Sequence, residues 1–324
     1  MSDQHRRVPE RVRRAGAAAA ASPGLIKAVR SAENTAVVHD PARGQLWRAS
    51  WDDVAQLVLV LRIIGTGTVV VAPVTTDPPA CDESSVVVSA DLTMLGHTAT
   101  LWGGLAMEVP FLVFDLLLGN LAPTVVDAVE HVAAGGGAEM LPEGVSAGTP
   151  VVSPFDPAAE VRAELSDALE RLRGAAWAPR ALGSGKSLRE LLRGRSDVPV
   201  LMEELTKALG LGLPDVLSIL MGKRPVTPEQ APLVARVTGL TEEEVLSAVS
   251  PLPSGLVSEL DRPRWRKALR AQRRSGESET AARLTVAYGT LALAARQTGS
   301  ASAPSWPQRI HQYLATHPPD RPDR

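Results

Sequence analysis

The stretch from Leu205 to Val249 reads LTKALGLGLPDVLSILMGKRPVTPEQAPLVARVTGLTEEEVLSAV. It combines short apolar runs with residues that begin and end helices. Gly210 supplies the positive φ that a helix end favours. Pro214 stands at the start of the next apolar run, and Gly222 follows the end of that run. Proline near a helix start and glycine after a helix end is the expected order. Short helices joined by tight turns are typical of a helix-turn-helix unit.

Two further helix starts complete this stretch. Thr227 is placed to cap a third helix, with Pro228 at its first position. Thr241 and Glu244 have the spacing of a capping box, which opens a fourth helix. We therefore expect four short helices here, the second of them over 214–221.

The run ALGL, followed by SILMGKRPVTPEQAPLVARVTGLTEEEVL, resembles the Cro/CI-type (Xre-family) helix-turn-helix, in particular its antitoxin-like branch. The resemblance covers residues 205–249. In that family the helix after the turn lies in the DNA major groove. The resemblance implies that one group of residues faces the bases and that two residues lie by phosphate. The first group is Gly212, Leu213, Pro214, Asp215 and Ser218, and the second is Lys223 and Arg224.

This sequence departs from the family on the face that would read DNA. Base edges are read by hydrogen bonds, yet Leu213, Leu217 and Met221 are apolar, and Asp215 would lie close to phosphate. Residues 181–254 hold eight Lys or Arg against nine Asp or Glu. Because DNA affinity comes largely from neutralised phosphates, a helix-turn-helix kept for protein contacts is an open alternative.

Composition excludes several classes of protein. The 324 residues contain no apolar run long enough for a membrane span. The basic start and its short alanine run do not make an export signal, so a cytoplasmic location is expected. A single cysteine, Cys81, excludes an internal disulfide and a Cys-based zinc site. The histidines show no metal-ligand spacing. We expect no metal, no cofactor and no catalytic residue.

Charge is sorted along the chain, although the total is only −2. Residues 1–30 carry seven basic and two acidic side chains, and residues 31–180 carry seven and nineteen. Residues 255–324 carry twelve and six. The basic ends could contact nucleic acid, or the acidic middle of the same or another subunit.

The N-terminal part reads as a basic flexible arm, 1–30, followed by a small β-barrel domain, 31–137. Short β-rich runs separated by Gly and Pro turns predict the strands, and residues 65–67 predict a hairpin turn. Strands are expected at 57–61, 69–71, 86–88, 98–105 and 109–114, and helix at 116–118 and 123–133.

This region resembles, more distantly, the MazF/PemK/CcdB-type toxin barrel. The similar runs are GQLWRASW at 44–51, LVLVL at 57–61 and VVVAPVTT at 69–76. In the ribonuclease members an Arg-Pro before the second strand and a Thr or Ser after the third carry cleavage. Thr75 and Thr76 match the second position, but Ala55 and Gln56 replace the first. The resemblance therefore implies a catalytically silent barrel that serves dimerisation or partner binding.

Helices dominate the remainder. A Pro-, Gly- and Ser-rich linker is expected at 138–160, with a helix that Asp156 caps running to Leu172. The helical region 161–254 contains the helix-turn-helix, 205–249. A C-terminal helical domain follows at 255–316, then a disordered tail at 317–324. In that domain Trp265 and Leu269 are expected to share a buried face.

The sequence thus predicts an α+β multidomain protein: a small β-barrel, a central all-α helix-turn-helix domain and a C-terminal helical tail. The expected function is a DNA-binding transcriptional regulator, acting as a homodimer because half-sites of such readers are usually paired. The β-barrel or the C-terminal helices are expected to contact a protein partner. One alternative is an antitoxin-like adaptor that does not read DNA. A second is a toxin-like ribonuclease.

Overall fold

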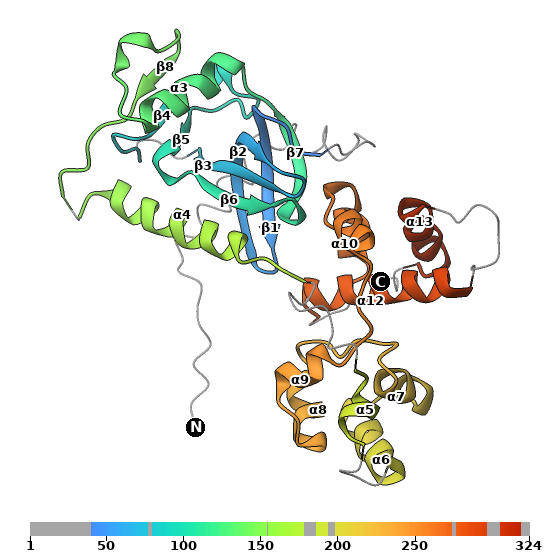
Figure 1. Ribbon diagram of the computed structural model, residues 1–324. Helices are drawn as coiled ribbons and strands as arrows, with labels where there is room; N and C mark the ends of the chain where they lie inside the picture. Colours follow the sequence, from blue (N-terminus) through green and yellow to red (C-terminus); the bar gives the residue numbers. More distant parts are fainter. Residues whose placement is uncertain are drawn as a thin grey trace, which may run out of the picture. The chain divides into compact units, whose positions relative to one another are not determined.

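The computed structural model describes residues 40–76, 80–153, 155–177, 186–193, 198–273, 277–296 and 305–318. The chain divides into two compact units, Met1–Ala175 and Ala176–Arg324. The first contains an antiparallel sheet and the second contains helices (Figure 1), which confirms a mixed α+β class. The boundary between the units lies beyond the predicted linker, 138–160, and inside the predicted helical region, 161–254.

The sheet of the first unit has eight strands, and their described pairings are all antiparallel. The strands follow the order β7-β1-β2-β3-β5-β4-β8, and β6 pairs with β3 beside this path. Residues 65–67 form the turn of the predicted hairpin. The strands are β1 (Gln45–Trp51), β2 (Val54–Ile64), β3 (Thr68–Thr75), β4 (Val86–Val88), β5 (Ala99–Leu101), β6 (Met107–Pro110), β7 (Phe114–Asn120) and β8 (Val145–Ala147).

The structure corrects several predictions in this unit. The strands expected at 98–105 and 109–114 are shorter, because 3₁₀ helices occupy Gly103–Leu105 and Phe111–Val113. Residues 116–118, expected to be helical, lie in β7 and pair with β1. The predicted linker, 138–160, contributes β8, which pairs with β4. For β7 and β8 a strand distant in sequence supplies the backbone hydrogen-bond partners, which local sequence patterns do not reveal.

Closure of the sheet into the expected barrel is not found among the described strands. β7 and β8 stand at opposite ends of the pairing order, and no pairing joins them. The sheet is irregular, with register shifts between β1 and β7 and between β2 and β3. Such shifts bend the strand and increase its local twist.

Two helices complete the first unit. α3 (Pro123–Ala133) buries Val125 and Val129 in the same apolar cluster as the sheet residues Leu59 and Val86. α4 (Pro157–Arg173) contacts β1, β2 and β6. The predicted cap is confirmed, because the Asp156 carboxylate accepts a hydrogen bond from the backbone N–H of Ala158 at 2.9 Å. Short 3₁₀ helices lie at Ala90–Leu92, Gly103–Leu105, Phe111–Val113 and Ala138–Met140.

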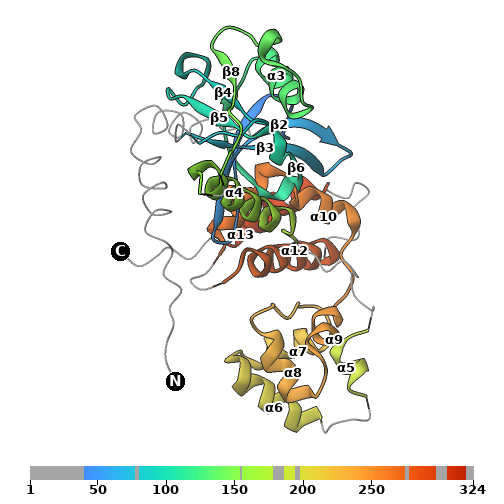
Figure 2. The same cartoon turned by 90° about the vertical axis from the view of Figure 1, so that its left-hand side faces the viewer.

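The second unit contains two groups of helices. Figure 2 shows α5 to α9 gathered together. The helices are α5 (Leu188–Leu191), α6 (Val198–Leu209), α7 (Leu213–Leu220), α8 (Ala231–Thr238), α9 (Glu242–Ser247), α10 (Ser254–Leu260), a 3₁₀ turn at Pro263–Trp265, α11 (Arg266–Ala271), α12 (Glu279–Arg296) and α13 (Trp306–Thr316). The predicted burial of Trp265 and Leu269 is confirmed.

Several predictions lie outside the described residues. They include the basic arm, 1–30, and residues 319–324 of the predicted tail. Among the described helices, none is long and apolar enough to cross a lipid bilayer.

Candidate nucleic-acid interface

The helix pair α6–α7 forms where the sequence predicts it. Gly210 adopts a φ of +62°, the left-handed conformation that lets the chain turn after α6. α7 begins at Leu213, one residue before the predicted start, because Gly212 takes the N-cap position. After Met221 the chain turns again at Gly222, where φ is +66°.

The inner face of α7 is fixed by an apolar core. Val216, Ile219 and Leu220 are buried in a cluster with residues of α6, α8 and α9. The opposite face is open. Leu213, Leu217 and Met221 follow one another at helical spacing and are 49%, 41% and 41% exposed. We call these three residues the apolar row.

The predicted base-facing residues lie along the exposed side of α7. Gly212, Leu213 and Pro214 are exposed at its first turn. The Ser218 hydroxyl, one turn later, donates to the carbonyl of Pro214 at 2.9 Å. Its proton is therefore used within the helix, so in this conformation the Ser218 oxygen is available only as an acceptor. Asp215 remains half-exposed.

The two predicted phosphate residues differ in their surroundings. The backbone N–H groups of Lys223 and Arg224 both donate to the Ser218 carbonyl, at 2.9 and 3.1 Å, which fixes the turn after α7. Arg224 Nη1 lies 2.6 Å from Asp215 Oδ1. Lys223 is exposed and has no ion pair within the described residues. The sequence grouped Lys223 and Arg224 together, but only Lys223 presents an uncompensated charge.

The start of α8 differs from its prediction. The helix begins at Ala231, because Pro228, Glu229 and Gln230 form a turn rather than the first helical residues. The capping box of α9 is as predicted. Thr241 Oγ1 accepts from the Glu244 N–H at 3.2 Å, and the Glu244 carboxylate accepts from the Thr241 N–H at 2.8 Å.

The sequence missed the contribution of α5 to this surface. Ser187 caps α5 through a capping box with Glu190, which is a local pattern of the sequence. The sequence does not show that α5 packs against α7. This packing brings the exposed Arg189 to the end of α7, where Arg189 Nη1 lies 3.7 Å from Met221 Sδ. In the sequence, the only signal that Arg189 belongs to this surface is its basic side chain, and no motif surrounds it.

The residues of the alternative ribonuclease hypothesis lie in β2 and at the end of β3. Thr75 ends β3, and its hydroxyl accepts a hydrogen bond from Trp102 Nε1 at 3.1 Å. At the position that would need an arginine, Gln56 Nε2 donates to the carbonyls of Leu57 and Val74. No cationic side chain stands there. Within the described parts of the chain, no group of His, Cys, Asp and Glu has the arrangement of a metal site.

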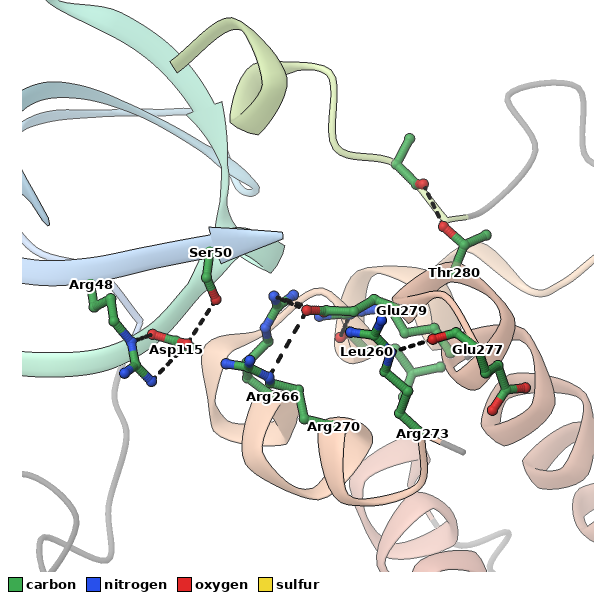
Figure 3. Close-up of polar contacts among 12 residues, drawn as sticks. Arg48, Ser50, Asp115, Leu260, Arg266, Arg270, Arg273, Glu277, Glu279 and Thr280 are labelled. Carbon is green, nitrogen blue, oxygen red and sulfur yellow. Dashed lines mark hydrogen bonds and ion pairs between the residues drawn. The ribbon is translucent and has the colours of Figure 1, made fainter. Parts of the chain in front are cut away.

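The most buried charges of the second unit lie among its last helices. Glu279 forms an ion pair with Arg266 at 2.7 Å and faces Arg270 at 4.0 Å (Figure 3). The nearby Arg283 is fully buried, and this desolvation lowers its pKa to about 10. Burial also raises the pKa of Asp261, which accepts a hydrogen bond from Trp177 Nε1 at 2.7 Å. Arg266 and Glu279 thus bond to each other, and Arg283 donates to the Leu260 carbonyl at 2.7 Å.

No protein-family model matches the chain. No curated protein is significantly similar to it.

Proposed function

We propose that the chain is a DNA-binding transcriptional regulator and that α7 is its reading helix. The resemblance of residues 205–249 to the Cro/CI-type helix-turn-helix supports this assignment. The observation that carries it is the pairing of an exposed α7 face with an uncompensated lysine, Lys223, directly after the helix. Such readers present one helix to the major groove and fix their position through phosphate contacts.

The chemistry of α7 sets the kind of DNA reading that is proposed. Leu213 and Leu217 offer methyl groups that can contact thymine methyls, but they offer no hydrogen-bond donors. Arg224 is held by Asp215, which removes one phosphate contact. We therefore expect modest sequence specificity and a salt dependence that arises from few contacts.

The first prediction concerns Lys223. Lys223→Ala removes one phosphate contact, so the log–log salt slope of DNA binding should fall by about 0.9. Arg224→Ala should change the slope much less, because its charge already faces Asp215. The measurement is a gel-shift titration of the full chain at two or more salt concentrations, with the DNA upstream of its own gene.

Charge-matched variants control this experiment. Lys207→Ala removes an exposed lysine from α6 and should leave the slope unchanged. Asp215→Ala releases Arg224 and should tighten binding to any sequence, whereas Glu203→Ala, with the same change in net charge, should not. Equal effects of Lys207→Ala and Lys223→Ala would contradict the assigned interface. Absence of any shift at low salt would refute DNA binding.

The apolar row supports a second candidate, a protein-binding adaptor. Three large apolar side chains on one exposed helix face are unusual for a surface that reads base edges by hydrogen bonds. The Asp215–Arg224 ion pair also reduces the attraction to phosphate. A pull-down from the native host, with and without nuclease, separates the two functions. A partner protein that survives nuclease, without recovered DNA, favours the adaptor.

We also propose that the first unit serves dimerisation or partner binding rather than catalysis. Its distant resemblance to toxin barrels and the absence of a cationic side chain at Gln56 support this role. Size-exclusion chromatography with light scattering, on the full chain and on a chain that lacks residues 1–175, tests it. Loss of the dimer only in the truncated chain would support the role, provided that circular dichroism shows the helices to be retained.

A further inference from the structure

A polar pocket lies beside the end of α7, between α5 and the turn at Gly222. Its cavity volume is about 490 Å³. Residues of α5 and of its two ends line the pocket together with Met221, Gly222 and Ser250. The lining residues are Ser187, Arg189, Glu190, Arg193, Met221, Gly222 and Ser250.

The charges around this pocket are mainly positive. Arg189 and Arg193 are exposed at its wall. Within the described residues, the side chain of Arg189 contacts only the neutral sulfur of Met221. Lys223 follows Gly222 directly along the chain. This part of the second unit therefore offers guanidinium groups whose donors are available to an anion.

The one carboxylate in the pocket lining, Glu190, offsets part of this charge through its Coulombic attraction to Arg193, so the two arginines leave a net positive charge in the lining. Glu190 accepts hydrogen bonds from the backbone N–H and the hydroxyl of Ser187, at 2.7 and 2.9 Å. These hydrogen bonds hold the pKa of Glu190 below its ordinary value, and the bond from the backbone N–H has the larger effect. The Glu190 carboxylate is thus hydrogen-bonded to Ser187 at the start of α5. The pocket lining contains two arginines and this one carboxylate.

We propose that this pocket holds a phosphate of the DNA backbone, with Arg189 and Arg193 as its donors. The inference rests on the proposed DNA-binding function and extends it. Lys223 and the pocket adjoin the same end of α7, so we assign neighbouring phosphates of one DNA strand to Lys223 and to the two guanidinium groups. The pocket supplies the cationic contacts that Arg224 does not, because Arg224 is paired with Asp215.

The test compares salt slopes of full-length variants on the same DNA duplex. Arg189→Gln plus Arg193→Gln should lower the log–log slope by roughly 1.8, at about 0.9 per contact, with similar weakening for unrelated sequences. Arg236→Gln, an exposed arginine of α8 outside the pocket lining, is the matched control and should leave the slope unchanged. Thermal unfolding of each variant verifies that the fold is retained.

A second arm distinguishes backbone phosphate from free phosphate. Inorganic phosphate, titrated at constant ionic strength without DNA, should bind weakly to wild type. Tight phosphate binding that needs both arginines, with the DNA slope unaffected by their loss, would overturn the inference. An unchanged slope in the double variant, while wild type binds DNA, overturns it and leaves the proposed function standing. No DNA binding by wild type overturns both.

Discussion

At the residue scale, paired charges decide which side chains are available for binding. Arg224 is compensated by Asp215, nine residues earlier in the sequence. Sequence reasoning placed both residues on the same surface, but it could not show that the turn at Gly222 folds one back onto the other. The same pairing occurs deeper in the second unit, where Glu279 compensates Arg266 and both are almost fully buried.

The buried pair gives a stability prediction. Glu279→Ala removes the carboxylate that lies 2.7 Å from the Arg266 guanidinium, and breaking a buried pair costs about 3–5 kcal/mol. Urea unfolding followed by far-ultraviolet circular dichroism measures the loss. Replacing both residues, Arg266→Met plus Glu279→Leu, should cost less than Glu279→Ala alone. A loss for Glu279→Ala no larger than that of a surface substitution such as Glu203→Ala would contradict this.

At the element scale, the helices of the second unit are tied together at Ser250. Its N–H donates to the Gly222 carbonyl at 3.0 Å, and its carbonyl accepts from the Tyr288 hydroxyl at 2.6 Å. The turn that ends α7 is thereby connected to α12. Burial raises the pKa of Tyr288 above the ordinary value of 10.0. The neutral form is therefore favoured in the folded state.

This shift predicts a dependence of stability on pH. A group whose pKa is raised in the folded state contributes stability that is present below its unfolded pKa and is lost as pH rises above it. Wild type should lose stability as pH rises above about 10, and the loss should be smaller in Tyr288→Phe. Tyr313→Phe is the control, measured by the same urea unfolding. If the free energy of unfolding depended on pH in the same way for wild type and Tyr288→Phe, the predicted pKa shift would be contradicted.

Elements that depend on local signals could be predicted from the sequence. The Asp156 cap of α4, the capping boxes of α5 and α9, and the β2–β3 hairpin are read from neighbouring residues. Elements fixed by distant partners could not be. β8 has only three residues and exists through its pairing with β4. Likewise, Arg189 joined the candidate site only once the packing of α5 on α7 was known.

At the scale of the whole molecule, the last helices contact the chain before and after the bundle of α5 to α9. Before the bundle, Trp177 donates to Asp261, and the Ala176 carbonyl accepts from the Thr280 hydroxyl at 3.2 Å. After the bundle, the chain continues directly into α10, which packs against α12. The proposed reading helix therefore belongs to the second unit, together with α10 to α13.

The most direct test of the central claim is amide hydrogen–deuterium exchange of the full chain, with and without the DNA duplex from upstream of its gene. We expect DNA to slow exchange in peptides that cover residues 187–193 and 212–224, and to leave the peptides of β1 to β7 unchanged. No change in residues 212–224 when the duplex is saturating, or protection confined to the first unit, would contradict the assignment of α7 as the DNA-reading helix.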